Sequence, residues 1–504
     1  MGAHARVLIP SARDGERAAA AERTVTSRWL PGGRAFLRLV AGLAMPQLAP
    51  VSAAPSDLGA VLLLHDLVAD MKARSERLKR LEQRLLEVVG SPLLAFVDHL
   101  GVPAEELDAG RLRSLGFHAA PAHPVDAEVF RHRSLTLPAI YRLASGRRRL
   151  AVSVDDVADF LVASGRWTEE AKIEGDPFGG LRRARLAESP RHELWVVERR
   201  GARGFTPRVS NSREISAAMR TREAFRRRPR YVAGGDDAAE VERMGRCAAL
   251  IQHGRTEFGP SRAAALFVEA ELERFSRRNR AGRILESRLR TLGVGFSHVD
   301  HLVYRSSRHR LRALIRIFEL LGFERRQSLS TGAYGAERLD HPELGLTVIV
   351  ETDLLEGEAD LDFSLRPGAP PGPIERYTLL HGESILGAGI HRLVVVADLE
   401  RARAILESDG VHTYAHPSRP GSHRAAVTSA EPWLPDVDRV AVAIERGALD
   451  PSFAIELTSL GAPGSELGLV ERADARRVFD AEALAKVVER RSHHAGKVRS
   501  RGIN

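Results

Sequence analysis

The chain has 504 residues, which is too long for one small core and predicts about two to four domains. A hydrophobic content of 43% is typical of a globular protein, and the single cysteine, Cys247, excludes a disulfide framework and a cysteine-rich metal site. The formal net charge is +9, but only five of the 75 basic residues are lysines, the arginines are scattered and aromatic content is 5%. We therefore expect no nucleic-acid partner.

The N-terminal half predicts several unlike regions. Residues 1–56 are rich in alanine and arginine and predict a disordered or leader segment, and residues 57–108 predict a helical region. Residues 109–205 contain short strands and helices, and residues 206–295 predict a linker and helices. No run is long and apolar enough to span a bilayer, so we expect no membrane partner. A lone cysteine suits a reducing compartment, which favours a cytoplasmic location.

The second half repeats one pattern twice. Residues 296–365 predict a strand at 298–305, a helix at 308–321 closed by Gly322, and strands at 334–339 and 346–351. After a loop at 366–388, residues 389–465 predict a strand at 389–396, a helix at 399–408 after Asp398, and strands at 425–428, 439–444 and 453–458. Residues 466–504 predict a C-terminal helix and tail. Paired βαβββ modules indicate an α+β fold.

The strand at 298–305 carries the residues of most chemical interest. Side chains alternate across a strand, so His301, Val303 and Arg305 are expected to line one surface. A histidine on such a strand is, taken alone, more often structural than a ligand. His298 competes with His301, but the two residues are three apart and are expected on opposite faces.

A fainter version of the repeat is expected at residues 109–205. There Arg149 stands in the position that His391 occupies in the second half, and we find no strand like the one at 298–305. We therefore expect a degenerate N-terminal cup that is structural and metal-free.

The paired units, with a histidine on each opening strand and a glutamate at the end of a late strand, resemble the vicinal oxygen chelate superfamily. That superfamily includes glyoxalase I, extradiol dioxygenases and 4-hydroxyphenylpyruvate dioxygenase. The resemblance covers residues 296–465 well and residues 110–205 weakly. It implies two modules that form a half-open β-cup around a divalent metal. The metal ligands that it implies are His301, His391 and Glu456, with Glu351 as an optional fourth.

The separation of His301 and Arg305 also resembles the 2-oxoadipate dioxygenase/decarboxylase (2-hydroxyglutarate synthase) family, in which an arginine on this strand binds substrate. The strand after His391 departs from that family. The resemblance implies a non-haem Fe(II) dioxygenase that uses O₂ to decarboxylate a 2-oxo acid, either 2-oxoadipate-like or aryl-pyruvate-like, with Arg305 holding a carboxylate. The alternatives are a glyoxalase-like lyase or isomerase with Zn, Ni, Co or Mn, and a metal-free small-molecule-binding protein of the same fold. A homodimer is left open.

Overall fold

We describe a computed structural model of the chain, from residue 55 to residue 471, except for 121–126, 133–136, 145, 166–171, 203, 229, 231–236, 332–333, 356–357, 359–371 and 416–424. The helix predicted in the tail beyond residue 471 and the leader before residue 55 lie outside this part. In the part of the chain that is described, none of the helices combines the length and the apolar character needed to cross a membrane.

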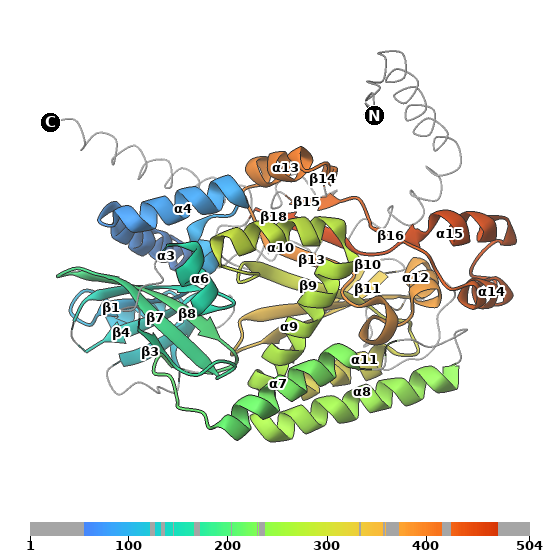
Figure 1. Ribbon diagram of the computed structural model, residues 1–504, viewed down its shortest axis with the longest axis horizontal. Helices are drawn as coiled ribbons and strands as arrows, with labels where there is room; N and C mark the ends of the chain where they lie inside the picture. Colours follow the sequence, from blue (N-terminus) through green and yellow to red (C-terminus); the bar gives the residue numbers. More distant parts are fainter. Residues whose placement is uncertain are drawn as a thin grey trace, which may run out of the picture. The chain divides into compact units, whose positions relative to one another are not determined.

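Two eight-stranded open sheets organise the chain (Figure 1). The first sheet contains β1 (Val97–Pro103), β2 (Phe117–Ala120), β3 (Ala127–His132), β4 (Ala139–Leu143), β5 (Arg148–Ser153), β6 (Ile173–Glu174), β7 (Leu181–Glu188) and β8 (His192–Arg199). The second contains β9 (Val299–Arg305), β10 (Glu324–Thr331), β11 (Tyr334–His341), β12 (Leu346–Asp353), β13 (Arg392–Val396), β14 (Thr413–Ala415), β15 (Ala425–Thr428) and β18 (Glu466–Val470).

The two sheets have the same strand order. The first runs β2-β3-β4-β1-β5-β8-β7-β6 and the second runs β10-β11-β12-β9-β13-β18-β15-β14. In each sheet two βαβββ modules meet where their opening strands pair antiparallel, β1 with β5 and β9 with β13. The crossover helices are α5 (Ala109–Ser114), α6 (Val157–Ala163), α11 (Leu311–Leu320) and α13 (Leu399–Ser408). The predicted α+β fold with paired modules is confirmed, and the first half is as complete as the second.

Local sequence explains where these crossover helices begin and end. The Asp398 side chain accepts a hydrogen bond from the backbone N–H of Arg401 at the start of α13. Gly322 follows α11 with a φ of +87°, a left-handed conformation that glycine adopts without a steric penalty. Both signals were read from the sequence and are confirmed.

The remaining helices connect and cover the sheets. They are α3 (Pro55–Ala73), α4 (Glu76–Val88), α7 (Ser212–Arg227), α8 (Asp237–Phe258), α9 (Pro260–Arg278), α10 (Arg280–Leu292), α12 (Pro373–His381), α14 (Val437–Glu445) and α15 (Ala454–Leu460), with short turns of helix at η1 (Leu93–Phe96), η4 (Ser384–Ala388) and η5 (Pro451–Phe453). A small ribbon pairs β16 (Pro432–Trp433) with β17 (Ala462–Pro463). Helix α9 contacts α7, α8 and α10, and its buried side chains make residues 206–295 part of the core rather than a linker (Figure 1).

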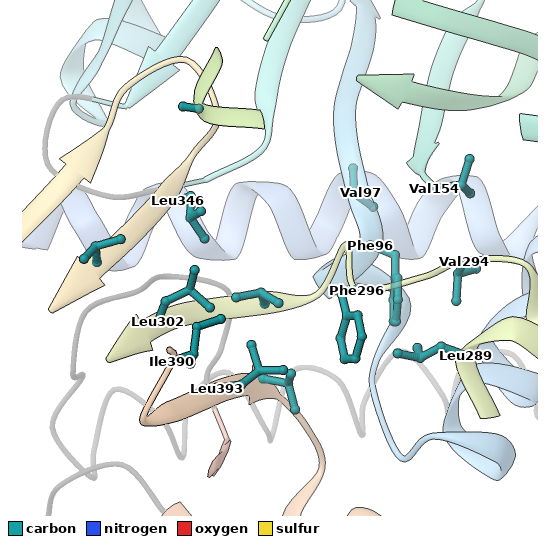
Figure 2. Packing of buried hydrophobic residues seen from close by; sticks show 14 of the residues in the cluster. Phe96, Val97, Val154, Leu289, Val294, Phe296, Leu302, Leu346, Ile390 and Leu393 are labelled. Atoms are coloured by element: carbon teal, nitrogen blue, oxygen red, sulfur yellow. The ribbon is translucent and has the colours of Figure 1, made fainter. Parts of the chain in front are cut away.

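One hydrophobic cluster joins the two halves. Phe96 at the end of η1 and Phe296 before β9 lie beside each other, and Leu302 and Leu393 from the central strands of the second sheet belong to the same cluster (Figure 2). All four side chains are buried. Because the same cluster contains residues from both sheets, loss of packing in one half is expected to be felt in the other.

Four predictions about element types and bounds were wrong. Strand β1 lies inside the region 57–108 that was predicted to be helical. The predicted strands at 439–444 and 453–458 are parts of the helices α14 and α15, and the last strand of the module is β18, beyond the predicted end at residue 465. Both segments are short apolar runs that follow helix-starting residues: Asp436 caps α14, and the Asp450 side chain accepts from Ser452 N–H just before α15.

Candidate functional site

Strand β9 divides its side chains between the core and the concave face of the second sheet. Leu302 and Tyr304 belong to the large hydrophobic cluster, whereas His301, Val303 and Arg305 do not. The predicted common surface of these three residues is therefore confirmed. We call this surface, together with the facing side chains of β12 and β13, the C-terminal cup.

His298 lies apart from the cup. Its ring stacks between Phe96 and Phe296, with centroid separations of 4.8 and 6.5 Å. The side chain is buried, neither ring nitrogen has a hydrogen-bond partner among the residues that the structure describes, and burial lowers the pKa of the imidazole to about 3. His298 is therefore a neutral core residue, as the strand alternation predicted.

A buried ion pair lies at the carboxyl end of β9. Arg305 Nε donates to Glu351 Oε2 over 3.0 Å, and the two side chains are 7% and 2% exposed. Strand register explains the pairing, because Glu351 on β12 lies directly opposite Arg305 on β9. Burial alone would raise the pKa of Glu351, but Arg305, Arg392 and a hydrogen bond from Tyr334 hold it below its usual range. Glu351 is therefore a carboxylate that already has partners.

Helix α12 places an aromatic residue against this pair. α12 packs on β9 and β12, and the Arg305 guanidinium carbon lies 4.9 Å from the centre of the Tyr377 ring. The Tyr377 hydroxyl is buried and has no hydrogen-bond partner in the part of the chain that is described. Burial raises the pKa of Tyr377 above 10, so the hydroxyl keeps its proton and is a donor.

His391, next to Tyr377, has a second buried polar atom without a partner among the described residues, its Nε2. Its Nδ1 lies 3.0 Å from the Gly464 carbonyl oxygen, which can only accept, so Nδ1 carries the proton and Nε2 carries a lone pair. Nε2 is buried and makes no hydrogen bond to any described residue, and the ring meets Tyr377 edge-on at 5.0 Å. Burial, followed by the positive charges of Arg305 and Arg392, places the pKa of His391 well below its usual range. His391 is thus a neutral base.

The predicted metal ligands do not converge. His301 lies on the cup face with Nδ1 2.6 Å from Asp300 Oδ2. Glu456, predicted at a strand end, is exposed on α15, and Glu351 is engaged by Arg305. Among the described residues, no group of three or more His, Cys, Asp and Glu side chains could hold a metal ion. The facial set of His301, His391 and Glu456, with or without Glu351, was therefore wrong as a geometric expectation, because the segment that carries Glu456 is a helix.

The first sheet provides an internal comparison for the cup. Its opening strand repeats the Val-Asp-His-Leu sequence of β9, with His99 at the position of His301, and the Asp98–His99 contact of 2.7 Å matches Asp300–His301. The expectation that the first half lacks such a strand was therefore wrong. His99 lies opposite Ala151 and His301 lies opposite Val394, so Ala151 and Val394 are equivalent positions. The residues two positions earlier, Arg149 and Arg392, are therefore also equivalent, and Arg149 does not correspond to His391 as predicted.

The two cups share one ion pair and differ in the other. Arg149 with Glu193 in the first cup corresponds to Arg392 with Glu466 in the second, at 3.4 and 2.9 Å. By the same register, the positions of Arg305 and Glu351 are occupied in the first cup by the apolar residues Pro103 and Leu143.

Aromatic side chains also pack together in the first cup. Tyr141, Trp195 and Phe205 form a separate buried cluster on its concave face. A pair that occurs in both cups is explained by the fold alone, whereas Arg305, Glu351 and the neighbouring Tyr377 and His391 require another explanation.

The alternation of β9 had already indicated Arg305, but the sequence did not reveal Tyr377, Tyr334, Arg392 or Glu466. Tyr377 comes from a helix outside the repeated module, so no repeat could indicate it. Arg392 and Glu466 could have been found, because the repeated strand register places them opposite each other.

No family model matches the sequence, and no curated protein matches it. Among solved structures, the chain is similar to a protein from Ralstonia eutropha JMP134 assigned to the glyoxalase superfamily, with 14% identity, 54% of this chain and 100% of that chain covered, and a TM-score of 0.30. It is similar to a variant of 4-hydroxymandelate synthase from Streptomyces coelicolor, with 13% identity, 80% and 99% coverage and a TM-score of 0.21.

A third similar structure is the Mn(II)-bound glyoxalase from Novosphingobium aromaticivorans, with 10% identity, 77% and 85% coverage and a TM-score of 0.17. These structures are members of the glyoxalase, or vicinal oxygen chelate, superfamily, and they do not confirm the resemblance to the 2-oxoadipate family. At such TM-scores they carry no argument about activity. The strand order, which gives four βαβββ modules in two cups, establishes the fold.

Proposed function

We propose that the C-terminal cup binds a small molecule that carries a carboxylate group. The observation that carries the proposal is the pair of orphaned polar atoms, Tyr377 Oη and His391 Nε2, which are buried beside the Arg305 guanidinium. Buried polar atoms in folded proteins almost always have partners. A ligand that supplies those partners accounts for the orphaned atoms.

The chemistry of the three side chains selects the ligand class. Glu351 holds Arg305 through Nε, and in the described part of the chain the terminal amino groups of Arg305 make no further hydrogen bond that would compete for them. These groups form the planar fork that binds a carboxylate. The Tyr377 hydroxyl donates to a neighbouring oxo or hydroxyl oxygen of the ligand, and His391 Nε2 accepts from a ligand hydroxyl.

A 2-hydroxy acid satisfies all three groups, because its hydroxyl lies next to its carboxylate and can both accept from Tyr377 and donate to His391 Nε2. A 2-oxo acid, whose oxo oxygen only accepts, satisfies Arg305 and Tyr377. The ligand's negative charge also offsets the two arginines that lower the pKa of His391.

Isothermal titration calorimetry with 2-oxoadipate tests this proposal, with 2-oxoadipate dimethyl ester as the uncharged control. A charge-assisted hydrogen bond contributes about 1.5–3 kcal/mol, so the acid is expected to bind at least roughly tenfold more tightly than the ester. Equal affinity of acid and ester, or no saturable binding of either 2-oxoadipate or phenylpyruvate, would contradict the proposal.

A second candidate is a metal-dependent enzyme, such as the Fe(II) dioxygenase that the sequence resemblance implied. It is favoured by the histidines: His301 and His391 each have Nδ1 next to an oxygen acceptor, the arrangement that orients metal-bound histidines. Metal analysis of anaerobically purified protein distinguishes the candidates. Stoichiometric iron together with O₂ uptake that depends on 2-oxoadipate supports the dioxygenase. Zinc, nickel, cobalt or manganese without O₂ uptake supports a lyase or isomerase, and neither result is expected of a metal-free carboxylate-binding cup.

A further inference from the structure

A positively charged cavity lies outside the C-terminal cup. It has a volume of about 420 Å³, and its lining includes Arg230, Arg274, Arg278, Arg439 and Trp433. Arg274 and Arg278 come from the last turns of α9, one helical turn apart on the same face. We call this space the arginine cavity.

The charges around the arginine cavity do not balance. Arg439 pairs with Glu240 at 3.0 Å, and Arg230 shares one oxygen of Glu271 with Arg228, each at 2.8 Å. Asp436 also lines the cavity. Among the described residues, the four arginines of the lining and Arg228, which lies behind it, are therefore accompanied by three carboxylates, an excess of two positive charges.

Neutral carbonyl groups hold the two remaining arginines. Arg274 donates to the Gly387 carbonyl oxygen. Arg278 donates to the carbonyl oxygens of Gly387 and Ala388, and both of its bonds are 2.8 Å long. Carbonyl oxygens orient a guanidinium group but do not neutralise it. Among the described residues, Arg274 Nε and Arg230 Nη1 are buried and have no hydrogen-bond partner. The cavity thus has both unused donors and unbalanced charge.

The electrostatic cost is visible at Arg274. Burial, followed by the positive charges of the neighbouring Arg230 and Arg278, lowers the pKa of its guanidinium to about 9. Perturbed groups of this kind concentrate at functional sites, where a ligand removes the cost. An anion in the cavity would restore the pKa toward its ordinary value.

Trp433 orients the guanidinium group of Arg278. The Arg278 guanidinium carbon lies 3.6 Å from the centre of the Trp433 ring, and Trp433 Nε1 donates to the Arg278 backbone carbonyl oxygen at 3.1 Å. A guanidinium stacked on an indole is restricted to one plane, so its edge is preorganised toward the cavity.

We propose that the arginine cavity binds a phosphate-type dianion, either free phosphate or the phosphoryl group of a small metabolite. Two negative charges match the two excess positive charges, and guanidinium groups from separate backbone positions suit a tetrahedral oxyanion better than one planar carboxylate. The volume lies within the range of small-molecule sites, which leaves space for more than a phosphate.

This site is distinct from the carboxylate site proposed in the cup, although the two are neighbours. His381 lines the cavity, and its ring lies 5.3 Å from that of Trp433 and 5.0 Å from that of Tyr377 in the cup. Variants at Arg274 therefore test the cavity without changing a residue assigned to the cup.

Isothermal titration calorimetry with inorganic phosphate at constant ionic strength tests the proposal, with glycerol 3-phosphate and succinate as comparison ligands. Wild-type protein is expected to bind phosphate saturably, and Arg274→Met to bind it at least about tenfold more weakly. Arg277→Met is the matched control, because Arg277 lies on the same helix but is 62% exposed and pairs with Glu273. Tighter binding of glycerol 3-phosphate than of phosphate identifies a phosphorylated metabolite as the source, and the reverse identifies free phosphate.

The melting temperature separates loss of binding from loss of folding. Without phosphate, Arg274→Met is expected to melt no lower than wild type, because it removes a buried and unbalanced charge. Arg230→Met provides the same test if Arg274→Met does not fold. Absence of saturable phosphate binding to wild type, equal phosphate affinity of wild type and Arg274→Met, or succinate binding as tight as phosphate overturns the proposal.

Discussion

The Arg305–Glu351 pair permits a comparison in which the loss of one partner is expected to cost more stability than the loss of both. Glu351→Leu removes the carboxylate and leaves a guanidinium that is only 7% exposed. Breaking one side of a buried ion pair destabilises proteins by about 3–5 kcal/mol, because the remaining charge is buried without compensation. We therefore expect Glu351→Leu to lower the free energy of unfolding by about that amount.

The double variant Arg305→Met/Glu351→Leu should be much less damaging. It gives the C-terminal cup the apolar character found at the equivalent positions of the first cup, Pro103 and Leu143. Replacing both partners of a buried pair with apolar residues is often close to neutral, so we expect a change within about 1–2 kcal/mol of wild type.

Urea denaturation followed by circular dichroism measures the three free energies, and Arg290→Met serves as a surface control. Arg290 pairs with Glu286 but is 75% exposed, so its loss should cost no more than about 0.5 kcal/mol. The reasoning is refuted if Glu351→Leu is as stable as wild type, or if the double variant loses as much stability as Glu351→Leu.

Three further predictions concern single residues. His298→Phe removes the imidazole between Phe96 and Phe296, whose two nitrogens have no partner among the described residues. Calorimetry should therefore show a stability gain of about 1–3 kcal/mol, and a loss would mean that the nitrogens have partners. Burial raises the pKa of Glu383 from 4.5 to about 8, so the unfolded chain releases this proton first and wild type loses stability as the pH rises between these values. Glu383→Gln lacks this loss, and its melting temperature relative to wild type should therefore rise between about pH 5 and about pH 8; a constant difference would contradict the assignment. Glu456→Ala should change the free energy of unfolding by less than about 0.5 kcal/mol and leave 2-oxoadipate affinity unchanged, because the side chain is exposed on α15.

Local patterns in the sequence predicted the second sheet well where strand alternation and capping residues agreed. The segment 298–305 was expected as a strand with two faces, and the structure has a strand at Val299–Arg305 with those two faces. The strand predicted around Glu456 was wrong because a seven-residue segment with scattered apolar residues fits strand and helix patterns about equally. Only the tertiary contacts decide between the two. The repeat extends further towards the N-terminus than the predicted start at residue 109, since the sequence Val-Asp-His-Leu occurs at 97–100 as well as at 299–302.

The candidate site was only half accessible from sequence. Arg305 and Glu351 were both singled out, but their pairing depends on the register of β9 against β12, which no local pattern specifies. Tyr377 reaches the cup from α12, after a long connection, so its role could be recognised only once the helix was placed.

The most direct test of the carboxylate-binding cup is the change in 2-oxoadipate affinity caused by Arg305→Met. Arg312→Met is the matched control, because Arg312 lies on α11 and is exposed. If Arg305 holds the carboxylate, the dissociation constant measured by calorimetry rises at least roughly tenfold in Arg305→Met and stays at the wild-type value in Arg312→Met. Unchanged 2-oxoadipate affinity in a folded Arg305→Met protein would contradict the account.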